Sequence, residues 1–194
     1  MDSQIVLALY HWAAASAVIS ALVVAIAQYA IFLLPLAVVV IWFWPGADTP
    51  ARRQAVLAAL VSGAIAVVLV VVVGHLVVRA RPFVVLGLTP LFPHAIDSSF
   101  PSDHELGSMA VALPILWARP RIGIWLTIWA LLIGFARVAS AVHWPTDILG
   151  SMAIAVVPAV VGLVLVAAVL SRIAPIRAWA EMLGVLEEPL GRSA

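Results

Sequence analysis

Three short segments hold most of the side chains that could do chemistry on an anion. They are 79–83 (the RPF segment), 99–105 (the PSDH segment) and 137–147 (the RHD segment, which has the spacing R-x5-H-x3-D). Together they supply three guanidinium groups, two imidazoles, the hydroxyl of Ser102 and the start of a predicted helix. Arginine presents forked donors that match phosphate oxygens. The inventory therefore predicts a phosphate site.

The two imidazoles suggest complementary roles. A neutral imidazole can attack phosphorus, and a second imidazole can protonate the leaving oxygen. The candidates are His143 in the RHD segment and His104 in the PSDH segment. Asp147 follows His143 by four residues and could fix the tautomer of its ring. Pro145 prevents a smooth continuation of the helix, so we expect His143 to lie in a turn.

Ser102 precedes a predicted helix and forms an S-x-x-E capping box with Glu105. The free backbone N–H groups of that first turn form an anion site. We expect Ser102 to share its hydroxyl between capping and phosphate binding. Asp147 could likewise cap the last long helix as well as orient His143.

The composition excludes a water-soluble enzyme and a nucleic-acid-binding module. Of the 194 residues, 65% are apolar and 10% are charged, whereas soluble domains have about 45–50% and about 25%. The formal charge of +1 leaves no basic field for nucleic acid. Cysteine is absent, which excludes disulfides and thiolate chemistry.

The elements that must position these side chains are membrane helices, since a span needs about 20 apolar residues. We predict an all-α, polytopic membrane bundle of five to six transmembrane helices in a single domain, 1–194. Residues 1–21 are predicted as an interfacial or tilted helix, although two tight spans before residue 44 are an alternative. Residues 171–194 are predicted as a cytoplasmic amphipathic tail. The expected spans are about 22–44, 55–78, 104–117, 122–139 and 147–170, with a turn at 45–50.

The arginines predict the orientation, because cytoplasmic loops are enriched in positive charge. Seven of the ten cationic residues fall at one predicted face: Arg52, Arg53, Arg119, Arg121, Arg172, Arg177 and Arg192. The other face has only Arg79, Arg81 and Arg137. The face with seven arginines is predicted to be cytoplasmic, so the three chemical segments face outward.

The three segments resemble the signature of the type 2 phosphatidic acid phosphatase superfamily: K-x6-R-P, then P-S-G-H, then S-R-x5-H-x3-D. Here the corresponding positions read G-x6-R-P at 74–82, P-S-D-H at 101–104 and A-R-x5-H-x3-D at 136–147. Within that superfamily the sequence is most similar to undecaprenyl-diphosphatases of the bacitracin-resistance type. These carry R-P-F and P-H-A-x-D-x-S-F-P-S-D-H, which residues 93–104 (PHAIDSSFPSDH) match.

The resemblance implies hydrolysis of undecaprenyl diphosphate to the monophosphate, which recycles the lipid carrier of cell-wall synthesis, without a metal or other cofactor. It implies a multi-pass protein of the bacterial inner membrane, with its site facing the periplasm or the outside. By position, His143 would form a phosphohistidine, Asp147 would orient it and His104 would be the general acid. The phosphoryl oxygens would be held by Arg81, Arg137, Ser102 and the backbone N–H of Asp103.

Three positions depart from the signature. Gly74 replaces its lysine, and we hypothesise that Arg79 supplies the missing cation; the alternative is that Arg79 is an interface anchor. Asp103 replaces a glycine and adds negative charge near an anion, and Ala136 replaces a serine. His94 and Asp97 belong to the branch pattern, but the sequence leaves their role open, as it does for Glu105.

Other functions remain open at this point. A sibling enzyme would act on phosphatidylglycerol phosphate, phosphatidate or lipid A, and a non-enzymatic transporter could keep the same phosphate site. Vanadate haloperoxidases share the signature but are largely soluble. Four acidic residues could together hold Mg²⁺, namely Asp97, Asp103, Glu105 and Asp147, although the arginines already provide positive charge. The sequence does not indicate the lipid's chain length or the oligomeric state.

Overall fold

The structure is a computed structural model that describes residues 1–45, 49–172 and 174–186, and the ordered elements of these residues are helices. In order they are α1 (Asp2–Ala14), α2 (Ala17–Tyr29), the 3-10 turn η1 (Ala30–Phe32), α3 (Leu33–Phe43), α4 (Thr49–Leu76), α5 (Pro82–Val85), α6 (Asp103–Ala118), α7 (Pro120–Ala139), α8 (Pro145–Arg172) and α9 (Ala174–Met182). The predicted all-α membrane bundle is confirmed. Gly46–Asp48 of the predicted 45–50 turn, and Arg192 of the predicted tail, lie outside the described residues.

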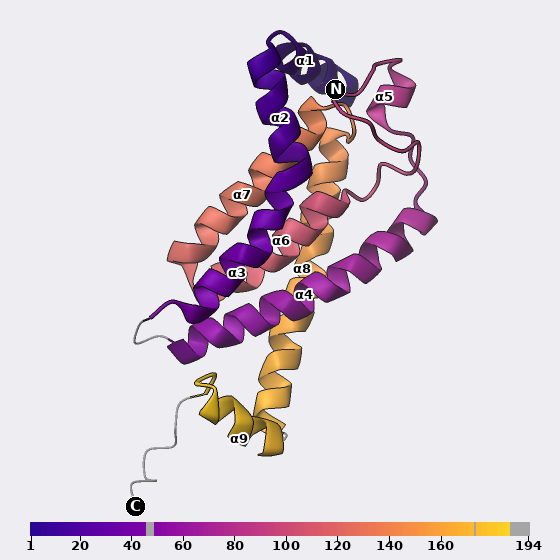
Figure 1. Cartoon of the computed structure of the whole chain (residues 1–194). Coiled ribbons are helices and arrows are strands. Elements are labelled where there is room, and N and C mark those ends of the chain that lie inside the picture. The colour runs from indigo at the N-terminus through magenta and orange to yellow at the C-terminus, as the bar shows by residue number, and fades with distance from the viewer. Residues whose placement is uncertain (46–48, 173, 187–194) are drawn as a thin grey trace, which may run out of the picture.

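Four helical stretches are long and apolar enough to cross a membrane: Ala17–Phe43 (α2, η1 and α3 together), Thr49–Leu76, Pro120–Ala139 and Pro145–Arg172. The remaining predicted span, 104–117, corresponds to α6. This helix has 16 residues and is about 24 Å long at 1.5 Å per residue. This helix packs against α4, α7 and α8 and occupies the centre of the bundle (Figure 1). Its surroundings are therefore mainly protein.

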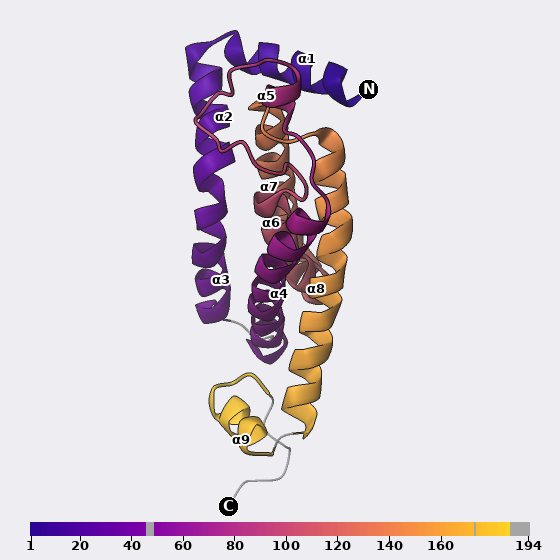
Figure 2. The ribbon, with the colours of Figure 1, turned by 90° about the vertical axis from the view of Figure 1, so that its right-hand side faces the viewer.

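α1 does not continue into α2. The backbone turns extended at Ser16 (φ −142°, ψ 132°), and α1 then lies across one end of the bundle (Figure 2). It contacts α2, α7 and α8. This brings the start of the chain to the end of the bundle where the RPF and RHD segments lie.

Small residues let the long helices approach closely, as is typical of membrane bundles. Where α4 crosses α8, Gly162 lies against Ser62, whose hydroxyl donates to the carbonyl of Ala58 at 2.7 Å. A Cβ added to Gly162 would come within 2.3 Å of the Ser62 Oγ. The crossing therefore requires glycine at this position.

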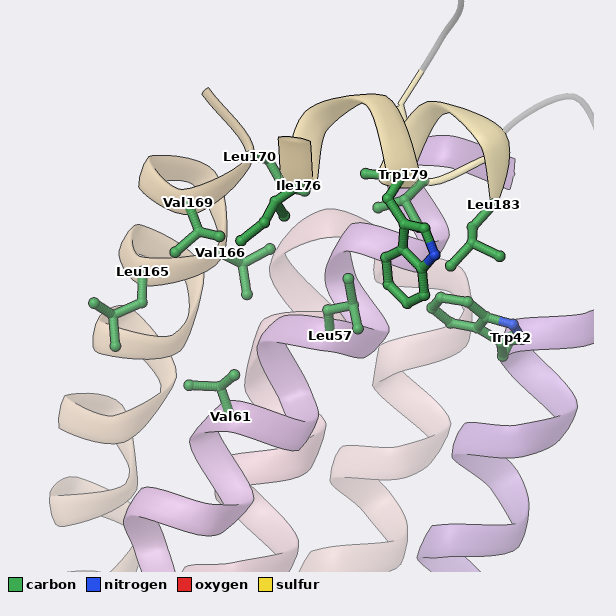
Figure 3. Close-up of a pocket in the computed structure, with 12 residues that line it drawn as sticks. Trp42, Leu57, Val61, Leu165, Val166, Val169, Leu170, Ile176, Trp179 and Leu183 are labelled. Atoms are coloured by element: carbon green, nitrogen blue, oxygen red, sulfur yellow. The ribbon is translucent and has the colours of Figure 1, made fainter. Parts of the chain in front are cut away.

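The RPF, PSDH and RHD segments lie at one end of the bundle (Figures 1 and 2). The other end holds the start of α4, the junction of α6 and α7, and the end of α8 with α9, which carry Arg52, Arg53, Arg119, Arg121, Arg172 and Arg177. At the end away from the RPF, PSDH and RHD segments, α9 folds back under α4 and α8. It closes a cavity of about 480 Å³ whose walls are wholly apolar and include Trp42 and Trp179 (Figure 3). This cavity carries no group that could act on a phosphate, so the chemistry lies at the other end.

Candidate active site

His143 lies in a fully buried turn between α7 and α8. Ala141 in that turn has φ of 60°, a left-handed conformation that is uncommon for a residue with a Cβ and that concentrates at functional sites. The RPF segment holds the turn in this shape. Phe83 N–H donates to the Ala141 carbonyl at 3.0 Å, and Arg81 Nη1 donates to the Val142 carbonyl at 2.8 Å.

Backbone and hydroxyl contacts also join the PSDH segment to the other two. The N–H of Ser99 donates to the carbonyl of Arg79 at 2.8 Å. The N–H of Ser102 donates to Ser151 Oγ on α8 at 2.8 Å. Three segments separated widely in sequence therefore converge at one end of the bundle.

The contacts of His143 define its tautomer from both sides of the ring. Nδ1 lies 2.7 Å from the carbonyl oxygen of Ser99, and a carbonyl can only accept a hydrogen bond, so Nδ1 carries the proton. Nε2 lies 3.3 Å from Arg81 Nη1 and 3.2 Å from Arg137 Nη2, and guanidinium groups can only donate. Nε2 therefore presents its lone pair to the two arginines.

Burial also keeps this imidazole neutral. It lowers the pKa of His143 to about 4, and the positive charges of Arg137 and Arg81 lower it as well. Asp147 and Asp103 act in the opposite direction and raise this pKa. At neutral pH the ring is uncharged, as a nitrogen nucleophile must be.

The buried positive charges of Arg81 and Arg137 are only weakly compensated by nearby carboxylates. Arg81 Nε pairs with Asp97 at 2.7 Å, but that carboxylate is more than half exposed. Arg137 has one carboxylate within 4 Å among the described residues, the largely exposed Asp103 at 3.6 Å. Positive charge held in a buried site with weak partners favours binding of an anion.

Asp103 lies between the two candidate catalytic imidazoles. Its Oδ1 is 3.0 Å from His104 Nδ1 and 4.0 Å from His143 Nε2. His104 lines a cavity of about 400 Å³ together with Arg137 and with Tyr29 and Phe32, which lie beside the end of α2. The structure thus brings both imidazoles to one site.

Ser102 is the N-cap of α6, and its hydroxyl accepts the N–H of Glu105 at 3.4 Å. The hydroxyl is fully buried, so the cap is the role that its contacts define. The reciprocal half of the capping box is not formed, which corrects the sequence interpretation. Ser102 N–H bonds to Ser151 instead. The buried Glu105 carboxylate packs against Gly134, and within the described part of the chain neither of its oxygens has a hydrogen-bond partner.

Asp147 is fully buried near His143 but does not bond to its ring. The Oδ2 atom accepts the Trp144 N–H at 2.8 Å, which caps α8, and lies 3.8 Å from His143 Nδ1. The proton on Nδ1 goes to the Ser99 carbonyl instead. In this arrangement Asp147 acts on the ring through its charge.

Arg79 is not directed at the proposed phosphate position. Its guanidinium group donates to Asp147, Thr146 and Asp2, and it does not line the cavities that contain Arg81 and Arg137. The hypothesis that Arg79 replaces the signature lysine therefore has no support in the geometry. Gly74 does line the cavity of about 460 Å³ beside Arg81, and that position remains without a cation.

His94 and Asp97 are site residues whose roles the sequence left open. His94 Nε2 lies 3.0 Å from Arg137 Nη2, and its ring is edge-on to that of His143 at 6.5 Å. Burial and Arg81 lower the pKa of His94, and the Arg81 guanidinium lowers the pKa of Asp97 despite partial burial. The branch pattern signalled both residues, whereas the carbonyl of Ser99 carries no signal in the sequence.

Among the described residues, no three carboxylates or imidazoles gather in a way that could hold a metal ion. The positive charge in the site comes from Arg81 and Arg137.

Comparison with known proteins agrees with this geometry. The PAP2 superfamily matches residues 55–171, which include all three segments. The chain belongs to the PAP2 superfamily. Undecaprenyl-diphosphatase BcrC of Bacillus subtilis (strain 168) is 34% identical over 157 residues, 81% of this chain and 80% of that protein. Putative undecaprenyl-diphosphatase YbjG of Escherichia coli (strain K12) is 37% identical over 132 residues, 68% of this chain and 65% of that protein.

A solved structure supports the same fold. The crystal structure of Aquifex aeolicus LpxE superposes with a TM-score of 0.64 at 21% identity, covering 81% of this chain and 93% of that one. This likeness concerns the fold alone. Family membership, the named relatives and four membrane-length helices together identify the chain as a multi-pass membrane lipid phosphatase.

Proposed function

We propose that this PAP2 phosphatase hydrolyses undecaprenyl diphosphate to undecaprenyl phosphate and inorganic phosphate, through a phosphohistidine on His143. The observation that carries the proposal is the direction of the His143 Nε2 lone pair, which faces the guanidinium groups of Arg81 and Arg137 at 3.3 and 3.2 Å. A terminal phosphate bound by both arginines would lie next to the nucleophile. The relatives named undecaprenyl-diphosphatase support the choice of lipid.

The reaction would proceed in two displacements. In the first, His143 Nε2 forms a bond to the terminal phosphorus while the bond from phosphorus to the bridging oxygen breaks. The lipid monophosphate leaves with that oxygen, and His104 donates a proton to it. In the second, a water molecule attacks the phosphohistidine, His104 takes its proton, and the bond from Nε2 to phosphorus breaks to release inorganic phosphate.

The chain's own charges fit these steps. Arg81 and Arg137 hold fixed donors in a buried site, where they stabilise charge that develops on the phosphoryl oxygens more strongly than in water. The carbonyl of Ser99 keeps the proton on Nδ1, so Nε2 remains available. Asp147 lies 3.8 Å from Nδ1 and opposes the positive charge that the ring gains when Nε2 bonds to phosphorus.

The position of His104 supports a lipid leaving group. It lines the same cavity as Tyr29 and Phe32, which are largely exposed residues of the first membrane-length helical stretch. A general acid beside exposed aromatic side chains is suited to a bridging oxygen whose other substituent is a lipid.

We also propose that the site faces the periplasm or the outside of a bacterial inner membrane. The uneven distribution of arginine between the two ends of the bundle supports this orientation. A tag inserted between α3 and α4, at residues 46–48, should be protected from an impermeant reagent in intact cells. Labelling of that tag from outside would reverse the orientation.

Phosphate release from the purified protein in detergent with excess chelator tests the activity. Wild type should release one phosphate per undecaprenyl diphosphate, and His143→Ala and His104→Ala should each lose at least two orders of magnitude. Faster turnover of phosphatidate, phosphatidylglycerol phosphate or a lipid A phosphate would reassign the substrate. Lipid movement across vesicles without phosphate release would replace the enzyme with a transporter.

A further inference from the structure

A hydrogen-bonded network joins the N-terminal helix to the residue behind the proposed nucleophile. Arg79 Nη1 donates to Asp147 Oδ1 at 2.6 Å and to Thr146 Oγ1 at 2.7 Å. Its Nη2 donates to Asp2 Oδ2 at 3.0 Å, and the Thr146 hydroxyl also donates to Asp2. The network therefore ties α1, the segment before α5, and the start of α8 together.

The buried carboxylate of Asp147 depends on this network for its charge balance. The side chain is fully buried, and a buried carboxylate is costly unless it is paired and hydrogen-bonded. Arg79 supplies a full positive charge to Oδ1, and the Trp144 N–H supplies a donor to Oδ2. The guanidinium group of Arg79 also lies over the Trp144 ring, 5.3 Å from its centroid.

Asp2 and Asp147 both pair with the guanidinium group of Arg79. The Asp2 carboxylate pairs with one end of the guanidinium group while Asp147 pairs with the other. Asp2 belongs to α1, which lies outside the part of the chain that matches the PAP2 superfamily. A residue outside the matched region thus contacts the ion pair next to His143.

We propose that Arg79 is a positioning residue, which together with Asp2 of the N-terminal helix fixes the place and the charge of Asp147 behind His143. The proposal rests on the proposed function in one respect, since it takes His143 to be the nucleophile. It assigns to Arg79 a role in the catalytic turn rather than on the phosphate.

Loss of the charge of Arg79 and loss of the charge of Asp2 should shift the pKa of His143 in opposite directions. Asp147 Oδ2 lies 3.8 Å from His143 Nδ1, so its negative charge favours the protonated ring. Loss of the Arg79 charge leaves Asp147 unopposed and should raise the pKa of His143 above its value of about 4. Loss of the Asp2 charge leaves Arg79 wholly to Asp147 and should lower that pKa.

Other charged groups face His143, but these substitutions leave them unchanged. Those that lie within 4 Å of the ring or that act on its pKa are Arg81, Arg137, Asp103 and Asp147, and the His94 ring lies 6.5 Å away. Arg79 itself faces Asp2 and Asp147. A network that only braced the fold would reduce stability in both variants without shifts of opposite sign.

Histidine side-chain NMR tests the proposal directly. The chain has five histidines, and the His143 signal can be assigned by its loss in His143→Asn. Titration of labelled protein in detergent from pH 7 to pH 4 should show the pKa of His143 raised by about one unit in Arg79→Gln. In Asp2→Asn the protonated fraction of His143 at pH 4.5 should be lower than in wild type.

Two further variants complete the design. Arg79→Lys keeps the charge and should restore the wild-type titration. Arg177→Gln is the matched control, because it removes an exposed arginine that pairs with Glu181 at the opposite end of the bundle, and it should leave His143 unchanged. Shifts of the same sign in Arg79→Gln and Asp2→Asn, or none in either, would overturn the proposal.

The titration requires no substrate, so it separates this proposal from the proposed function. If the two shifts appear but no lipid phosphate is hydrolysed, the network stands and the proposed function fails. If hydrolysis is intact and the shifts are absent, the network fails alone. If Arg79→Gln does not fold, Asp2→Asn decides: a lower protonated fraction supports the proposal and an unchanged one overturns it.

Discussion

Arg137→Met should separate stability from function, because the buried guanidinium of Arg137 has few partners that need it. Its Nη1 donates to the Ala27 carbonyl at 3.4 Å, and its Nη2 lies 3.0 Å from His94 and 3.2 Å from His143. Among the residues that the structure describes, its Nε is buried without a partner, and the carboxylate within 4 Å, that of Asp103, is largely exposed. Methionine fills much of the same volume without a charge.

The magnitudes follow from these contacts. After substitution, His143 Nε2 still contacts Arg81, and the half-buried His94 can bond to water. The Ala27 carbonyl loses a long hydrogen bond of 3.4 Å. A buried charge without a close buried partner carries a desolvation cost, so replacing it with an apolar side chain should leave the stability unchanged or raise it. For a chain of this size, about 1 kcal/mol corresponds to about 2–4 °C in Tm. Loss of the phosphate donor should cost about 10²–10³ in kcat.

Thermal unfolding in detergent, with and without orthovanadate as a phosphate analogue, measures both effects. At a vanadate concentration of 100 Kd the wild type should gain about 2.7 kcal/mol, or about 5–10 °C. In Arg137→Met the unliganded Tm should be unchanged or higher. A hundredfold weaker Kd should leave about 0.4 kcal/mol of vanadate stabilisation.

Arg52→Met provides the control. Arg52 is equally buried but lies at the opposite end of the bundle, where it donates to the carbonyl of Trp44 and to Thr49. Its substitution should lower the Tm and leave the vanadate shift intact. The reasoning is refuted if Arg137→Met unfolds several degrees below wild type while its vanadate shift stays at the wild-type value.

Three further predictions concern packing, the phosphate cavity and pH. A Cβ on Gly134 would come within 2.4 Å of Glu105 Oε2, so Gly134→Ala should lower the free energy of unfolding by about 1–3 kcal/mol. A Cβ on Gly107 would have nothing within 4 Å, so Gly107→Ala should raise the free energy of unfolding by up to about 1 kcal/mol. Equal Tm changes in the two variants would contradict this prediction. Gly74→Lys has room, since its Cβ would meet Phe100 O at 3.7 Å, and should lower the KM severalfold in steady-state assays; an unchanged KM would show that the added ammonium does not reach the phosphate. Burial holds the pKa of His143 at about 4, below its unfolded value of about 6.5, so the unfolded chain binds the extra proton. The free energy of unfolding should therefore fall by about 1.4 kcal/mol per pH unit from pH 6.5 towards 4, and His143→Gln should lack this component in calorimetry.

The helices and the convergence of the three segments could be predicted from the sequence. Long apolar runs leave helices as the way to satisfy backbone groups in a bilayer, and the prediction of 122–139 agrees closely with α7. Arg81, Arg137, His104 and His143 were expected together, because R-x5-H-x3-D combined with R-P-F and P-S-D-H is a specific pattern. In the structure Arg81 and Arg137 contact His143, and Asp103 lies near both His104 and His143.

The details that the sequence did not predict depend on competition between partners. Asp147 was expected to bond to His143, but its oxygens are taken by Arg79 and by the Trp144 N–H, while a backbone carbonyl takes the imidazole proton. Backbone carbonyls look alike in any sequence, so the role of Ser99 had no signal. Arg79 was expected at the phosphate, but the distant Asp2 reaches it only because α1 crosses the end of the bundle.

The central claim is tested most directly by trapping the phosphorylated enzyme. Wild-type protein and His104→Ala should be mixed with undecaprenyl diphosphate labelled in the terminal phosphate, then quenched in alkali, where phosphohistidine persists, and analysed by mass spectrometry and phosphorus NMR. We expect the label on Nε2 of His143, since Nδ1 is held by the Ser99 carbonyl at 2.7 Å. Label on Nδ1 or on another residue, or full turnover in His143→Ala, would contradict the account.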